Sequence, residues 1–130
     1  MNERKLEEFT RSPCPVANIL DIVGDKWTLL IVRDMIMGKR RYGEFQDSPE
    51  KIPTNILADR LKRLISAEII DKDAYQQKPV RYEYKLTDKG RDLQLVMESM
   101  VKWSNKHIPG TYTEAEISRF IEQGNKETAK

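Results

Sequence analysis

Apolar residues recur at helical spacing near the start of the chain and predict two consecutive helices. The first covers residues 15–24, where four apolar side chains follow this spacing and Gly24 is a plausible stop. The second covers residues 26–37, with Asp25 as its cap and Gly38 at its end. Because this second helix is apolar nearly all round, we expect it to be the buried central helix.

A short helix and a strongly amphipathic helix follow. The short one lies in "KRRYGEFQDSP", and the amphipathic one is "TNILADRLKRLISAEII", which Thr54 begins as N-cap or first-turn residue after Pro53. The apolar face of the amphipathic helix contains Leu57, Leu61 and Leu64. Its opposite face carries Asn55, Asp59, Lys62 and Arg63. The first face should enter the core and the second should be exposed.

The pattern then changes to an alternation with a period of two, which predicts a β-hairpin. The two alternating runs are "IIDKDAYQ" and "VRYEYKLT", and the tip between them carries Lys78. Arg81 begins the returning strand. Both residues therefore lie at or next to the tip of the hairpin.

Helical spacing resumes after the hairpin. One helix is predicted from Asp88 to about Lys106, and a last short helix covers residues 113–124 and begins with the capping-box pair Thr113 and Glu116. Residues 125–130 are expected to be frayed.

This order of elements predicts a mainly α protein with a small β-hairpin, an α+β chain with the winged helix-turn-helix fold. The 130 residues suit a single domain. We expect the winged core at about residues 15–92. An arm over residues 1–14 and helices over residues 93–124 would serve dimerisation.

Charge supports a nucleic-acid partner only through its distribution. The net charge is +2, but residues 39–91 hold 13 Lys or Arg and 9 Asp or Glu. A basic middle fits a nucleic-acid face, although an ordinary mixed surface fits equally well. The charged N-terminus, and the lack of an apolar run long enough to span a membrane, predict a cytoplasmic protein without membrane partners. With one histidine and one cysteine, we expect no metal site and no cofactor.

The predicted winged fold suggests how the polar residues of the amphipathic helix and the hairpin could bind DNA. A helix that fills the major groove must offer donors to base edges and phosphates. Asn55 can pair with adenine, while Lys62 and Arg63 can reach guanine or phosphate. Phosphate contacts are also expected from the cluster before the short helix and from the hairpin, through Lys39, Arg40, Arg41, Lys78 and Arg81. Each of these groups, taken alone, could simply be a solvated surface.

Four segments give the chain a family resemblance: "CPVANILDIVGDKWTLLIVRDM", "RRYGEF", "IPTNILADRLKRL" and "RYEYKLTDKGRDL". They closely resemble the signature segments of the HxlR-type transcriptional regulators, bacterial winged-helix proteins related to the MarR group. The resemblance covers roughly residues 12–107. It implies a homodimer on a pseudo-palindromic operator, with residues 54–64 as recognition helix and residues 76–81 as wing.

Dimerisation has its own sequence signal. The helix that follows the hairpin carries more apolar residues than a small core can absorb, and Phe9 and Leu6 lie in the N-terminal arm. Further apolar residues extend from this helix into the last one: Met97, Met100, Val101, Trp103, Phe120 and Ile121. We expect them to pack across a two-fold axis, although they could instead cover their own domain.

The single cysteine, Cys14, stands between two prolines. Pro15 suits the first position of a helix, and Cys14 before it should adopt the extended conformation of an N-cap residue. The positive helix end would then favour a reactive thiolate. The resemblance implies the same role, since several family members sense electrophiles or oxidants through the matching cysteine. Some members use a second, different cysteine in the partner subunit, and this version is excluded because the chain has only one cysteine. The alternative is that Cys14 is a small buried apolar residue with no reactivity.

Other functions are less well supported by the sequence. It contains no Ser/His/Asp set, paired acidic motif, glycine-rich phosphate loop or HExxH motif, so we expect no enzymatic activity. His107 lies far from Cys14 and suits a helix C-terminus better than a catalytic base. The remaining alternative is a winged-helix protein-interaction module without redox sensing.

Overall fold

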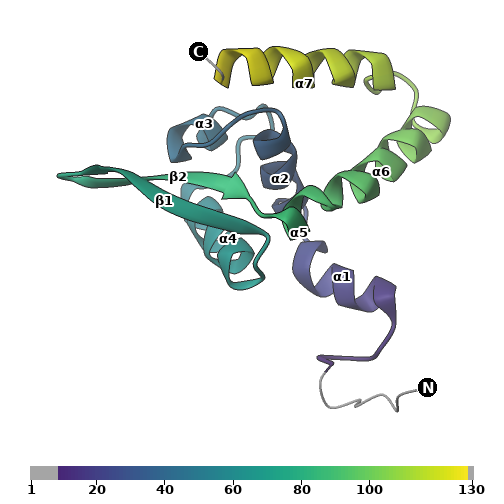
Figure 1. The fold of residues 1–130 in the computed structure, drawn as a ribbon. Coiled ribbons are helices and arrows are strands. Elements are labelled where there is room, and N and C mark those ends of the chain that lie inside the picture. Colours follow the sequence, from purple (N-terminus) through teal and green to yellow (C-terminus); the bar gives the residue numbers. More distant parts are fainter. Residues whose placement is uncertain (1–8, 129–130) are drawn as a thin grey trace.

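Within residues 9–128, which the computed structural model describes, the chain forms seven helices and one antiparallel β-hairpin (Figure 1). The elements are α1 (Pro15–Val23), α2 (Thr28–Ile36), α3 (Tyr42–Gln46), α4 (Thr54–Ser66), β1 (Ile70–Gln77), β2 (Val80–Leu86), α5 (Asp88–Arg91), α6 (Leu93–His107) and α7 (Glu114–Thr128). This is the winged helix-turn-helix that the sequence predicts, with the hairpin as the wing.

The core forms around α2 and α4. Ile31 and Val32 of α2 are buried, and Leu57, Leu61 and Leu64 of α4 face them as the amphipathic pattern predicts. Gly38 follows the end of α2 with a φ of 104°, a left-handed conformation that favours glycine. The central position of α2 and its end at Gly38 are therefore confirmed.

The start of α2 differs from the prediction. The helix begins at Thr28, two residues after Lys26, because the Asp25 carboxylate accepts hydrogen bonds from the backbone N–H of Trp27 and of Thr28 at 3.1 and 3.2 Å. The Asp25 side chain thus binds the start of the helix, although Trp27 and not Asp25 occupies the N-cap position. Trp27 lies before the first turn and is only half-buried, so it is not a member of the buried helix.

The hairpin pairs Ile70 with Leu86 at its base and Gln77 with Val80 at its tip. Its base is anchored because Ile70 is fully buried and the Tyr84 ring meets the Phe45 ring edge-on, with centroids 6.2 Å apart. Its tip projects away from the helices, past α3 and α4 (Figure 1).

The prediction of one helix from Asp88 to Lys106 is wrong. The helix divides at Asp92 into α5 and α6. Thr87 caps α5 by accepting from the Gly90 N–H, and its hydroxyl donates to the Glu68 carbonyl at 2.6 Å. These bonds hold α5 against the α4–β1 junction, while α6 extends away from the core (Figure 1).

The last helix, α7, folds back over the core near α2 and α3 (Figure 1). Its capping box is confirmed, since Thr113 and Glu116 exchange hydrogen bonds. The expected fraying is wrong for residues 125–128, which continue the helix. Gly124 lets α7 approach the end of α2 closely, because a Cβ there would lie 1.7 Å from the Met37 carbonyl oxygen. Among the described residues, no helix is long and apolar enough to span a membrane.

Candidate DNA-binding interface

The helix-turn-helix unit consists of α3, the turn over residues 47–53 and α4. Side chains of α3 hold the first residue of α4 in place. The Tyr42 hydroxyl donates to the Thr54 carbonyl at 2.8 Å, and the Gln46 amide donates to the Thr54 hydroxyl at 3.3 Å. Thr54 therefore lies at the start of α4, as predicted, with its hydroxyl bound to α3.

The exposed face of α4 is the one that the sequence predicts. Its exposed members include Asn55, Asp59, Lys62 and Arg63. Arg63 is not free on this surface, because its Nε lies 3.1 Å from an Asp59 carboxylate oxygen one turn earlier. Asn55 and Lys62 are left as polar groups of this face that make no side-chain hydrogen bond or ion pair within the described residues.

Arg60 is a residue of α4 that no sequence pattern singled out. Its Nε donates to the Asp25 carboxylate at 2.9 Å, and its guanidinium also contacts Asp59. Partial burial raises the pKa of Asp25, but hydrogen bonds from Thr28 and Arg60 outweigh it and lower the pKa to about 2. Arg60 thus ties α4 to the junction of α1 and α2, a link across 35 residues that no local pattern signals.

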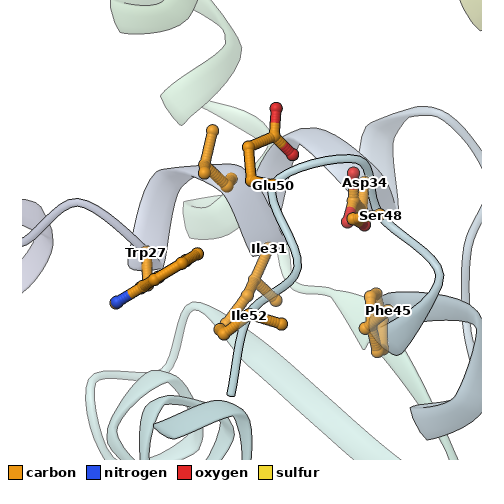
Figure 2. Close-up of a pocket in the computed structure, with 8 residues that line it drawn as sticks. Trp27, Ile31, Asp34, Phe45, Ser48, Glu50 and Ile52 are labelled. Atoms are coloured by element: carbon orange, nitrogen blue, oxygen red, sulfur yellow. The ribbon is translucent and has the colours of Figure 1, made fainter. Parts of the chain in front are cut away.

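A polar network fixes the turn between α3 and α4, and Figure 2 shows its members Asp34, Ser48 and Glu50. Arg33 of α2 donates two hydrogen bonds of 2.7 Å to Glu50 and also binds Asp34. Ser48 donates to the buried Asp34, and Lys39 donates to Ser48 at 3.1 Å. The hydrogen bonds from Arg33 lower the pKa of Glu50 below its usual value. Hydrogen bonds from α2 and Lys39 therefore fix the turn, and α4 begins at a defined position.

The hollow beside this network is too small for a typical ligand. Its cavity volume is about 10 Å³, and Trp27, Ile31 and Ile52 form its apolar side (Figure 2). Drug-sized ligand sites usually exceed about 300 Å³. Within the described residues, no three His, Cys, Asp or Glu side chains converge as metal ligands.

The basic cluster before α3 is divided by the fold. Lys39 is half-buried and bonded to Ser48. Arg41 is paired with Glu83 of β2 at 2.9 Å and stacks on Tyr75 of β1. Arg40 is exposed, and its side chain makes no ion pair in the part of the chain described. Arg40 and Arg41 are therefore both exposed, but the Arg41 side chain is held by Glu83 and Tyr75, whereas that of Arg40 is not.

The wing tip carries the two cations that the sequence placed there. Lys78 and Arg81 are exposed, and the Gln76 amide closes the tip by donating to the Pro79 carbonyl at 3.1 Å. The tip points away from α1 and α6, and α3 and α4 lie on either side of the hairpin (Figure 1). The arrangement presents one polar helix and one basic hairpin tip, the two parts with which a winged helix contacts DNA.

Cys14 lies at the other end of the molecule. It is the N-cap residue of α1, in the extended conformation expected from "PCP", and it is exposed. The preceding segment is held against α1, because Asn18 donates to the Ser12 and Cys14 carbonyls at 2.8 Å. The Cys14 side chain makes no capping hydrogen bond.

Comparison with known proteins identifies relatives of the whole winged unit. Residues 22–112 match the family model described as HxlR-like helix-turn-helix. The HTH-type transcriptional regulator Rv3095 of Mycobacterium tuberculosis is 36% identical over 94 residues, which cover 72% of this chain and 59% of that protein. The chain thus spans less than two thirds of this relative.

Two solved structures share the fold. PA1607, described as a candidate transcription factor, is 38% identical with a TM-score of 0.68, over 77% of this chain and 70% of its own. The redox regulator HypR in its oxidised form is 34% identical with a TM-score of 0.65, over 72% of this chain and 97% of its own.

Proposed function

The chain belongs to the HxlR-like helix-turn-helix family of transcriptional regulators, and we propose that it binds a specific double-stranded DNA operator as a homodimer. The observation that carries this proposal is the exposed polar face of α4 together with a basic wing tip that points away from α1 and α6 (Figure 1). Such a helix fits the major groove, and such a tip fits the flanking phosphates or minor groove.

The proposed contacts divide into two kinds. Asn55 reads adenine, and Arg63 reads guanine or phosphate from a direction that Asp59 fixes. Lys62, Arg40, Lys78 and Arg81 supply charge to the phosphates. Thr54, Lys39 and Arg41, which are bonded within the protein, support this surface more than they extend it.

Selection from a random-sequence duplex pool tests this proposal. The wild-type protein should enrich a pseudo-palindromic sequence, called the selected duplex below. Fluorescence anisotropy should then show an affinity for the selected duplex at least about 10³-fold higher than for an unrelated duplex. This affinity should decrease as the salt concentration rises. Failure to enrich any sequence would overturn the proposal and would favour a winged helix that binds a protein partner.

We assign dimerisation to the apolar surfaces of α1 and α6. Val16 and Leu20, one turn apart on α1, are 62% and 51% exposed. Leu95, Met100 and Trp103 of α6 are 69%, 51% and 60% exposed. Exposed apolar side chains in such number are unusual for a monomer, and a second copy covers them in our proposal.

The other expected dimer residues contribute less. Phe120 and Ile121 of α7 are half-buried within their own chain, as the alternative interpretation expected. Phe9 is half-buried too, and Leu6 lies outside the described residues. We therefore propose a winged core over residues 15–92 and a dimer contact centred on α1 and α6.

We also propose that Cys14 senses oxidants or electrophiles. The thiol is exposed, lies at the start of a proposed dimer helix, and belongs to a chain that is similar to the redox regulator HypR. With one cysteine in each chain, the available products are a thioether with an electrophile, a mixed disulfide with a small thiol, or a Cys14–Cys14 bridge across the dimer. Added bulk or a crosslink there would alter the spacing of the two α4 helices.

The sensing proposal is tested by treating the protein with a quinone or with diamide and a small thiol. Binding to the selected duplex should change in the wild type and stay unchanged in Cys14→Ser, and mass spectrometry should find the adduct on Cys14. Equal DNA binding before and after complete modification would leave Cys14 as a packing residue.

A further inference from the structure

The wing is attached to the helix-turn-helix unit by more than its own hairpin. The residues just before α3 run beside β2, where Arg41 and Glu83 form an antiparallel bridge and the Tyr84 N–H donates to the Arg40 carbonyl at 2.7 Å. The segment over residues 40–41 thus adds a short third edge to the two-stranded wing. Through this edge the wing and α3 share backbone hydrogen bonds.

The Arg41 side chain reinforces the same attachment. Its Nη2 lies 2.9 Å from the Glu83 carboxylate, and its guanidinium lies 3.8 Å from the centre of the Tyr75 ring. A planar guanidinium offers its edge to a carboxylate and its face to an aromatic ring at the same time, which lysine cannot reproduce. We call Arg41, Tyr75 and Glu83 the wing clamp, because it joins α3 to both strands.

Tyr75 reaches this position through an irregularity in β1. Ala74 pairs with Tyr82 and Gln76 pairs with Arg81, so Tyr75 is the extra residue of a β-bulge. A bulge bends its strand and redirects a side chain. Here the bend lies between the anchored base of the wing and its basic tip. The contact between Arg41 and Tyr75 therefore acts at the bend that separates Lys78 and Arg81 from the base of the wing.

We propose that Arg41 is a positioning residue of the wing, which acts with Tyr75 and Glu83 to set where the wing tip meets DNA. This rests on the proposed DNA binding, and it assigns Arg41 a role different from the phosphate contact of Arg40. The clamp fixes the angle of the wing relative to α4, and hence which part of the flanking DNA the tip reaches.

An uncharged substitution gives the sharpest test. Tyr75→Leu removes the ring that covers Arg41 without changing the charge of the protein. If the tip moves, Lys78 and Arg81 no longer reach their phosphates. The salt dependence of binding to the selected duplex should then weaken by up to about two units, one for each of these two cations. Fluorescence anisotropy over a salt series measures this slope.

Three comparisons separate positioning from a general effect on the fold. Tyr75→Phe, which keeps the ring, should bind as the wild type does. In the double variant Lys78→Ala/Arg81→Ala, Tyr75→Leu should have no further effect, because the contacts it controls are already absent. A duplex trimmed to the base pairs read by α4 should likewise bind wild type and Tyr75→Leu equally.

Tyr82→Leu is the matched control, since Tyr82 is an aromatic residue of the same wing whose ring lies under the Lys72 ammonium. Arg41→Lys is a second clamp variant. It should lower affinity for the untrimmed selected duplex although it retains the charge. An unchanged salt slope in Tyr75→Leu and Arg41→Lys, or an equal reduction in Tyr82→Leu, would overturn the clamp. A wild-type protein that binds no duplex would instead overturn the proposed function, and the clamp proposal with it.

Discussion

Asn55 and Arg63 share the exposed side of α4 but differ in their freedom to move. Arg63 is oriented by Asp59, whereas the Asn55 amide has no partner within the described residues and is free to form two hydrogen bonds with an adenine. A single amide that makes a bidentate contact with a base contributes about 1–3 kcal/mol of discrimination against the wrong base. Asn55 is for this reason the side chain of α4 whose removal should change sequence preference most.

Asn55→Ala should weaken binding to the selected duplex by about 1–3 kcal/mol, with little change for an unrelated duplex. The thermal midpoint should stay close to that of the wild type, because Asn55 is exposed. Anisotropy and circular dichroism melting measure the two quantities, with Ser66→Ala at the far end of α4 as the control. A parallel decrease on both duplexes would show that Asn55 contacts backbone rather than base.

Asp25 makes a second prediction at the same scale, for stability against pH. Hydrogen bonds from Thr28 and Arg60 lower its pKa to about 2 in the folded protein, below the usual value of 3.8. A lowered folded pKa means that the ionised carboxylate stabilises the fold. That contribution is complete above about pH 4 and is lost as the pH falls toward 2.

Asp25→Asn should therefore lower the free energy of unfolding at pH 7, and the difference from wild type should shrink as the pH falls from 4 to 2. Urea unfolding at several pH values measures this difference. Asp73→Asn is the control, because its partner Lys85 is exposed and such surface pairs contribute about 0–1 kcal/mol. A difference between Asp25→Asn and wild type that is independent of pH would contradict the role of the charge.

At the scale of elements, the wing and α4 contribute different things to binding. The face of α4 offers groups that distinguish bases, whereas the wing tip offers the charges of Lys78 and Arg81. Charge contacts with phosphate are insensitive to sequence and are recognised by their dependence on salt.

Lys78→Ala and Arg81→Ala should each lower affinity for the selected and unrelated duplexes alike, and each should reduce the salt slope by about one unit. Lys85→Ala, which removes the same charge near the base of the wing, should leave the slope nearly unchanged. Anisotropy titrations from low to high salt give all three slopes. If Lys85→Ala reduces the slope as much as the tip variants do, the protein reads net charge rather than a positioned wing.

Local signals explain which elements could be predicted from the sequence. The side chains of Asp25 and Thr87 accept hydrogen bonds from backbone N–H groups three residues later, and the leucines of α4 repeat with the helical period. Each of these signals involves residues only a few positions apart and can be read from the sequence. The break between α5 and α6 at Asp92 has no such local signal. An amphipathic pattern continues across such a turn without a change.

The same distinction holds for the candidate site. Sequence placed the cations at the right elements, since charge and element order are local properties. It could not tell Arg40 from Arg41, because Glu83 lies 42 residues after Arg41 and Tyr75 reaches it only through the bulge. The role of Arg60 could not be predicted for the same reason, because its partner Asp25 lies 35 residues away.

At the scale of the whole molecule, the proposed DNA-binding face and the proposed dimer face lie on different sides. The wing tip points away from α1 and α6 (Figure 1). A two-fold axis through α1 and α6 would then leave both α4 helices free to enter successive major grooves, roughly 34 Å apart. Cys14, at the start of α1, would lie beside this axis, where a small change in one helix alters the separation of both readers.

The dimer gives the last prediction. Trp103 of α6 is 60% exposed, so Trp103→Glu costs little inside one chain but places a charge within the proposed contact. The variant should sediment as a monomer at micromolar concentration and keep its helical circular dichroism. Its affinity for the selected duplex should fall by several orders of magnitude, toward that of a single half-site. Gln94→Glu adds the same charge to an exposed residue of α6 outside the apolar set, and it should remain a dimer.

A monomeric Trp103→Glu that still binds the selected duplex as tightly as wild type would show that one winged helix reads the operator alone. A variant that remains dimeric would move the contact away from α6.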